Sequence, residues 1–269
     1  MELQQSRHPG AGATITANSK YMKWLPLLLV LTACAALQSP AQNTLFLSEG
    51  KITFEKRTNL YEQMQEDDEN WSDLVKKSMP RFRNDYFELL FTKNKTLYQP
   101  GAPNPENDKI PDWIRTFENN TVFSDLEAEK STSRKEVFEQ PFIIQDSTRR
   151  IHWKITDEVR TIAGFGCRRA NAIIMDSVYV VAYYTDEITT PGGPESFTGL
   201  PGMILGVALP HEHLTWFATK VQAEPVTDAD LKIPVKGKKT TNKELRDMLA
   251  ERMKDWGKGG RRYQLVIML

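Results

Sequence analysis

The chain has 269 residues with 35 basic and 35 acidic side chains, so its formal net charge at neutral pH is zero. This balance argues against a nucleic-acid-binding protein, because such proteins concentrate basic charge to meet the phosphate backbone. Aromatic residues make up 10% of the chain and it holds 15 glycines and 15 prolines, which is typical of a β-rich globular protein rather than a disordered one.

The N-terminal segment predicts export. Residues 25–37 form an apolar run that is too short to span a bilayer, and Lys23 precedes it. Small residues follow at 39–41 with the spacing of a cleavage site, so we expect residues 1–41 to be a secretory signal peptide with a natural start at Met22. The remaining chain, 42–269, is then a single exported domain of the periplasm or cell envelope with no transmembrane span.

The same segment has a second interpretation. Leu-Thr-Ala-Cys at 31–34 is similar to a lipobox, in which Cys34 would be lipidated and the protein would be an outer-membrane lipoprotein. If the chain is cut after Ala41 instead, Cys167 is the one cysteine that remains, which excludes an intramolecular disulfide framework.

In the N-terminal half, alternation of apolar and polar residues predicts strands. Ile52 and Phe54 lie on one face of the first, over 50–60, and an acidic stretch at 66–69 opens a predicted helix that ends near Ser78. A proline-rich loop is predicted over 100–111. The further strands predicted are 85–91, 96–99, 121–123, 133–139, 142–146 and 150–156, the last with Ile151, Trp153 and Ile155 on one face.

The C-terminal half continues this pattern and then becomes helical. A hairpin is predicted over 168–175 and 177–185, a strand covered on both faces at 203–209, and another strand at 214–222. Thr241 and Glu244 form a capping box that starts a helix over about 242–256, with Gly257 as its C-cap. In the tail, 257–269, Gly259–Arg262 and the apolar run after it predict either an exposed interaction segment or a docked final strand.

Strands that follow one another through short turns favour an antiparallel sheet. We therefore predict a mainly β (α+β) fold with an antiparallel curved sheet or open half-barrel and one or two flanking helices. Periplasmic carriers of lipids and lipoproteins have this order of elements, which is an analogy of fold alone.

A turn bracketed by glycines lies at the centre of this order. Gly199 and Gly202 flank Leu200-Pro201, so the backbone can take positive φ on either side of a residue whose φ is fixed. The spacing fits neither common phosphate-binding loop, and no lysine follows the glycines. We interpret the turn as a corner between two core strands, with a docking loop for a partner as the alternative.

The turn continues into Met203 and Ile204, and this Gly-Leu-Pro-Gly-Met-Ile run resembles the signature of the GLPGLI family, exported Bacteroidota proteins of unknown function. The resemblance covers about residues 48–256. It implies a setting near TonB-dependent outer-membrane transporters, so an outer-membrane transporter or another envelope protein is the expected partner. The other residues that carry the resemblance include Trp153, Cys167, Tyr184, Pro194 and Phe197.

Three groups of residues are candidates for chemistry or ligand binding. His211 and His213 lie two positions apart, so both imidazoles of an extended chain would face one metal ion, although a solvated turn is the simpler interpretation. Cys167 beside two arginines would be a nucleophile if exposed, with His152 and Asp157 as base and orienter; a buried structural cysteine is the simpler interpretation. The aromatic residues that would line an apolar cavity, or simply pack, are Tyr179, Tyr183, Tyr184, Phe197 and Trp216.

The sequence therefore predicts an exported cell-envelope binding or accessory protein without catalysis and without a cofactor. The first alternative is a periplasmic carrier of a lipid or other hydrophobic ligand inside the curved sheet. The second is an enzyme or metal-binding protein that uses Cys167 or the pair His211 and His213.

Overall fold

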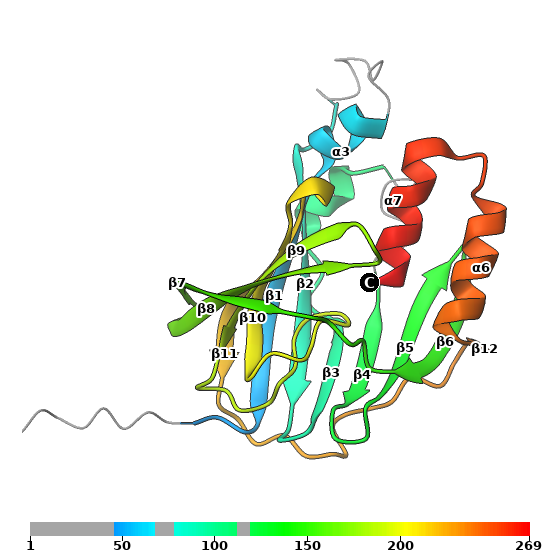
Figure 1. Cartoon of the computed structure of the whole chain (residues 1–269). Coiled ribbons are helices and arrows are strands. Elements are labelled where there is room, and N and C mark those ends of the chain that lie inside the picture. Colours follow the sequence, from blue (N-terminus) through cyan, green and yellow to red (C-terminus); the bar gives the residue numbers. More distant parts are fainter. Residues whose placement is uncertain (1–45, 68–77, 112–118) are drawn as a thin grey trace, which may run out of the picture. The chain divides into compact units, whose positions relative to one another are not determined.

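The structure is a computed structural model that describes residues 46–67, 78–111 and 119–269, all of which belong to one compact unit beginning at Leu45 (Figure 1). The predicted signal peptide and lipobox lie outside the described residues, as does the segment 68–77 of the first predicted helix.

The unit is built on one sheet of twelve strands in the order β12-β6-β5-β4-β3-β2-β1-β11-β10-β9-β8-β7. All neighbours are antiparallel except β12 and β6, which are parallel. The strands are β1 (Gly50–Asn59), β2 (Phe82–Phe91), β3 (Lys95–Pro100), β4 (Thr121–Asp125), β5 (Lys130–Val137), β6 (Gln140–Ser147), β7 (Lys154–Ile162), β8 (Phe165–Ile174), β9 (Val178–Thr185), β10 (Met203–Leu209), β11 (Leu214–Gln222) and β12 (Lys238–Thr240).

A few helices accompany the sheet, which confirms the predicted fold class. The described α-helices are α3 (Leu60–Asp67), α6 (Asn242–Arg252) and α7 (Gly257–Met268), and the short 3-10 turns are η1 (Pro105–Lys109) and η2 (Pro210–Glu212). Figure 1 shows the sheet curving around the end of α7, with α6 beside β5 and β6. Helix α3 begins at Leu60, before the acidic stretch at which the sequence pattern places a helix start.

The core follows from the alternation along the strands. On β1 the even positions are buried, from Ile52 and Phe54 through Lys56, so a lysine continues the apolar face. Strand β10 is buried on both faces as predicted, and the loop before it packs on Ile204: a Cβ on Gly193 would lie 2.8 Å from the Cβ of that residue. The capping box of α6 is also present: Thr241 accepts from Glu244 N, and Glu244 accepts from Thr241 N.

The prediction of a terminal strand is wrong, because residues 257–268 form helix α7. Helix α6 ends at Arg252, so Gly257 is not its C-cap; with a φ of +60°, Gly257 instead begins α7. Ile267 and Met268 are buried against α6 and β6, and Leu269 reaches the main core. A short apolar run is typical of a buried helix end as well as of a strand, so the run at the end of the chain did not distinguish the two.

The strand predicted at 150–156 is displaced, because β7 begins only at Lys154. The indole Nε1 of Trp153 donates to Thr198 O at 2.9 Å, which ties residues 150–153 to the glycine-bracketed loop rather than to the sheet. Ile155, predicted to share a face with Trp153, is 43% exposed.

The predicted tight turn is confirmed. Gly199 and Gly202 have φ values of +92° and +140°, and Gly202 N donates to Leu200 O at 2.8 Å. A Cβ on Gly202 would lie 2.1 Å from Thr185 O, at the point where β9 ends. The glycine is therefore required both by its φ and by the close approach of the two backbones.

We expect Gly202→Ala to lower the free energy of unfolding by about 3 kcal/mol or more, because it adds a backbone clash to the strain of positive φ. Gly164→Ala is the matched control: Gly164 has a φ of +89° but nothing within 4 Å of the added Cβ. Its cost is expected to be about 1 kcal/mol, from φ strain alone. Urea unfolding of both variants measures the difference, and equal losses would refute the close approach.

Candidate functional site

The loop that resembles a family signature packs as a corner between β9 and β10. Pro194, Phe197 and Leu200 are buried, and the Phe197 ring meets Trp216 edge to face at 6.0 Å between centroids. Thr198 Oγ1 donates to Pro191 O at 2.6 Å, which closes the loop on itself. These residues build the core and present two polar neighbours, Glu195 and Ser196, to the concave side of the sheet.

Glu195 makes a buried polar cluster. Its Oε2 accepts from Asn120 Nδ2 at 3.0 Å, and its Oε1 lies 3.9 Å from Lys56 Nζ. The Lys56 and Glu195 side chains are each 1% exposed, and the ammonium also lies 5.2 Å from the centroid of Trp216. The carboxylate offsets part of the cost of burying the lysine, because an isolated charge in a core is strongly unfavourable.

The same region holds the C-terminal end of α7. Lys135 Nζ donates to Ile267 O at 2.6 Å, Arg149 Nη2 donates to Met268 O, and the Ser196 hydroxyl contacts Leu269 O. The last carbonyls of a helix lack intrahelical donors and carry the negative end of its dipole. Two cations and a hydroxyl therefore cap α7 from β5, from the segment before β7 and from the signature-like loop.

Both cations have lowered pKa values. Burial lowers the pKa of Lys135 to about 8; Glu195 opposes this change, whereas the positive charges of Arg149 and Lys56 add to it. The pKa of Arg149 also lies below its ordinary value, first because of burial and then because of the positive charge of Arg246. Positive charge is thus crowded at this point of the fold.

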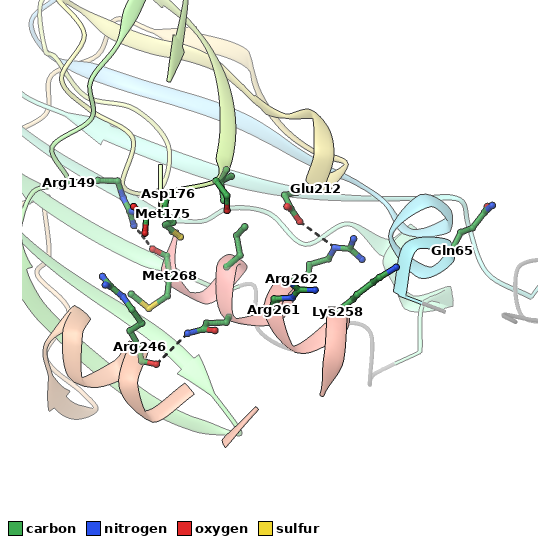
Figure 2. A pocket seen from close by; sticks show the side chains of 14 residues that line it. Gln65, Arg149, Met175, Asp176, Glu212, Arg246, Lys258, Arg261, Arg262 and Met268 are labelled. Atoms are coloured by element: carbon green, nitrogen blue, oxygen red, sulfur yellow. Dashed lines mark hydrogen bonds and ion pairs between the residues drawn. The ribbon is translucent and has the colours of Figure 1, made fainter. Parts of the chain in front are cut away.

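An open cleft of about 1170 Å³ lies beside this crowded region, and we name it the basic cleft (Figure 2). Its lining contains five basic side chains and two acidic ones, although the whole chain has equal numbers of each. The charged lining residues are Arg149, Arg246, Lys258, Arg261 and Arg262 with Asp176 and Glu212, and the remainder includes Gln65, Met175, Val178, Gln264, Leu265 and Met268.

Most of this positive charge lacks a close carboxylate. Arg262 is neutralised, since its Nε lies 3.5 Å from Glu212 Oε2 and its Nη1 donates to Gln63 O at 2.6 Å. Within the described ranges, no carboxylate lies within 4 Å of the charged groups of Arg246, Lys258 or Arg261. A water-accessible hollow with unpaired cations attracts anions, because its low-dielectric walls focus the field.

A smaller hollow of about 370 Å³ adjoins the basic cleft and shares Arg149, Met175, Arg246 and Met268 with it. It leads toward Lys135 and the hydroxyls of Ser131, Ser133 and Ser196. The positive lining therefore continues from the outer surface of α7 to the buried end of the same helix.

Cys167 lies on β8 and is fully buried. Burial raises the pKa of its thiol to about 12, so the thiol is protonated at neutral pH. Its thiol donates to Phe165 O at 3.5 Å, whereas His152 and Asp157 are exposed and neither is joined to it by a described hydrogen bond. The thiolate that nucleophilic chemistry needs is therefore disfavoured.

The two histidines lie at the η2 turn between β10 and β11. His211 is exposed, and His213 has a left-handed backbone with φ +54° that closes the turn onto Pro210 O. Across residues 46–67, 78–111 and 119–269, no group of three or more His, Cys, Asp and Glu side chains is arranged to hold a metal ion.

The five aromatic candidates do not line either hollow. Trp216 is buried against Phe197, and Tyr183 packs on Phe217 while its hydroxyl donates to Glu158 Oε1 at 3.1 Å. They are packing residues of the sheet.

The basic cleft could not be recognised in the sequence, because its cations are scattered from position 149 to position 262. The only local signal was Gly259–Arg262, which the pattern marked as an interaction segment. None of the described helices is both long and apolar enough to cross a bilayer.

Comparison with known families gives one match, over residues 172–206, to a family described as "Protein of unknown function (Porph_ging)". The matched segment runs from β8 through the loop into β10 and fits a protein of Bacteroidota type. It covers less than half of the chain. No curated protein matches the chain significantly.

Solved structures with a related arrangement are distant. Two structures of PNGF-II are each 14% identical with a TM-score of 0.49; they cover 75% and 74% of this chain, which spans about a third of theirs (33% and 32%). An uncharacterized conserved protein from Thermus thermophilus is 7% identical with a TM-score of 0.37, covering 78% of this chain and 99% of its own.

The lowered pKa of Lys135 predicts how stability changes with pH. Between pH 8 and 10.5 the unfolded chain holds this proton more than the folded chain does, so the free energy of unfolding rises with pH across that window. The rise is on the order of 3 kcal/mol, since each pKa unit corresponds to about 1.4 kcal/mol. Below pH 8 the charged, buried lysine destabilises the fold in full.

We expect Lys135→Met to lack this rise, as measured by urea unfolding at several pH values from about 7 to 10.5. The raised pKa values of Cys167 and Tyr263 act in the opposite direction, but they are common to both proteins and cancel in the difference. A parallel pH dependence in the two proteins would show that Lys135 is not the titrating group.

Proposed function

We propose that this protein is an exported cell-envelope binding protein without catalysis, and that it holds an anionic ligand in the basic cleft. The observation that carries the proposal is the set of Arg246, Lys258 and Arg261, which line one hollow without a close carboxylate in the described chain. An anion there would relieve the repulsion between Arg149 and Arg246, which contributes to lowering the pKa of Arg149.

Export and family form part of the same proposal. The N-terminal apolar run, with its basic start and small residues, supports export to the periplasm or cell envelope, either as a released protein or as a lipoprotein through Cys34. The Gly-Leu-Pro-Gly-Met-Ile run and the match over residues 172–206 support a GLPGLI-type assignment. By that resemblance, the protein is an accessory to TonB-dependent outer-membrane transport.

A carrier of an amphiphilic ligand is the second candidate. Met175, Leu265 and Met268 lie in the cleft among the cations, so an apolar portion of a ligand has a surface to contact. An enzyme is the weaker alternative, because Cys167 is buried and protonated and His211 is an exposed turn residue.

Native mass spectrometry of the protein purified from its own envelope fraction tests the proposal. We expect an adduct of an anionic compound on the wild-type protein and its loss from Arg246→Glu/Arg261→Glu, because the reversed charges repel an anion. The control is Lys243→Glu/Lys254→Glu, which makes the same change of charge on residues outside the cleft and should retain the adduct.

Cys167→Ala and His211→Ala should also retain the adduct. Its loss from either of these variants would move the assignment to the alternative sites. A bare polypeptide in the wild-type sample would contradict the proposal.

A further inference from the structure

We propose that the ligand carries two separate phosphate groups, each bound by one pair of cations at opposite ends of the basic cleft. This inference rests on the proposed function and adds the chemistry of the ligand. We name the pair Arg149 and Arg246 the inner subsite and the pair Lys258 and Arg261 the outer subsite; both pairs line the cleft.

The inner subsite is built around a guanidinium that is already held in place. Arg149 donates through Nε to Ser196 Oγ at 2.9 Å and through Nη2 to Met268 O. Its other amino group, Nη1, makes no hydrogen bond to the described residues, and guanidinium donors match the oxygens of a phosphate. Arg246 lines both hollows together with Arg149, and its positive charge contributes to lowering the pKa of Arg149.

The outer subsite lies on the first turns of α7. Lys258 and Arg261 are three positions apart, so they share one face of the helix. Both are exposed, and neither has a carboxylate partner in the described part of the chain. Arg262, the next residue, is occupied by Glu212 and Gln63 and instead fixes this end of α7.

The two subsites are separated along α7. Figure 2 shows Arg149 and Arg246 beside Met268, and Lys258, Arg261 and Arg262 toward the other end of the helix. Arg261 and Met268 are seven positions apart, which corresponds to roughly 10 Å along a helix axis. One phosphate cannot contact both pairs, so filling the cleft takes two anionic groups on one molecule.

The charges favour phosphate over carboxylate. Each subsite contributes two cations, and Asp176 lies beside Arg149 in the same cleft (Figure 2). A phosphate monoester carries about −1.5 to −2 at neutral pH, whereas a carboxylate carries only about −1. Gln264 and Leu265, which lie on α7 between Arg261 and Met268, also line the cleft and suit a neutral connecting group the size of a sugar. The ligand class is a sugar bisphosphate, either free or as the headgroup of a glycolipid.

Isothermal titration calorimetry with the full chain tests the two-subsite arrangement, using fructose 1,6-bisphosphate and fructose 6-phosphate as probes. We expect the bisphosphate to bind about tenfold or more tightly than the monophosphate, because only it engages both pairs. Arg246→Gln and Lys258→Gln/Arg261→Gln should each reduce its affinity to the monophosphate level. Lys243→Gln, an exposed change on α6 outside the cleft, is the control and should leave the affinity unchanged.

A second measurement distinguishes the source of the phosphates. Phosphatidylcholine vesicles that contain a bisphosphorylated disaccharide glycolipid should float the protein if the natural ligand is a lipid headgroup. Binding of the soluble bisphosphate without flotation indicates a free sugar phosphate. Either result supports the inference, and failure of both probes to bind overturns it.

Equal affinity for the two soluble probes would also overturn the inference. If the cleft variants then weaken both probes equally, anion binding stands and the two-subsite arrangement fails. Native mass spectrometry of the envelope-purified protein tests the proposed function independently, because that experiment assumes no particular ligand.

Discussion

A buried lysine and a half-buried arginine at the end of one helix organise this molecule. Lys135 and Arg149 donate to the carbonyls of Ile267 and Met268, which are the acceptors that α7 cannot satisfy itself. Ser196 adds a hydroxyl at Leu269. Burying these charges is unfavourable, as the lowered pKa of Lys135 shows, and the helix carbonyls and Glu195 partly offset that cost. The arrangement fixes α7 on the concave side of the sheet, and the position of α7 determines the basic cleft.

The signature-like loop acquires a role through this arrangement. Its buried apolar residues make a corner between β9 and β10, and its glycines let the chain pass close to the end of β9. Its polar residues Glu195 and Ser196 then meet Lys56 and Arg149. The apolar residues of the loop therefore do not line a binding site. It positions Arg149, whose guanidinium holds α7 with one part and faces the cleft with another.

Much of the fold could be predicted from the sequence because its signals are local. The alternation in β1, the hairpin of β8 and β9, and the capping box at Thr241 each depend on neighbouring residues. Helix α7 could not be predicted in this way, because a Gly-Gly pair followed by five apolar residues is equally typical of a loop that leads into a terminal strand. Its buried end packs on α6 and on β6, and the contacts with β6 join segments that are distant in sequence.

The candidate site was harder to predict than the fold. The balanced charge of the chain conceals a local excess, because the cations that line the cleft come from separate elements and meet only through the fold. The β1 pattern does place Lys56 on the same face as Ile52 and Phe54, so a buried charge on that face follows from the alternation, although Lys56 does not line the cleft.

Native-state hydrogen exchange of the amides of Leu265–Leu269 tests most directly whether Lys135 and Arg149 hold α7. Our account predicts slow exchange in the wild-type protein, and faster exchange of these amides in Arg149→Met while those of Phe87–Phe91 in β2 stay protected. Fast exchange of α7 in the wild-type protein, or unchanged protection in the variant, would contradict the account.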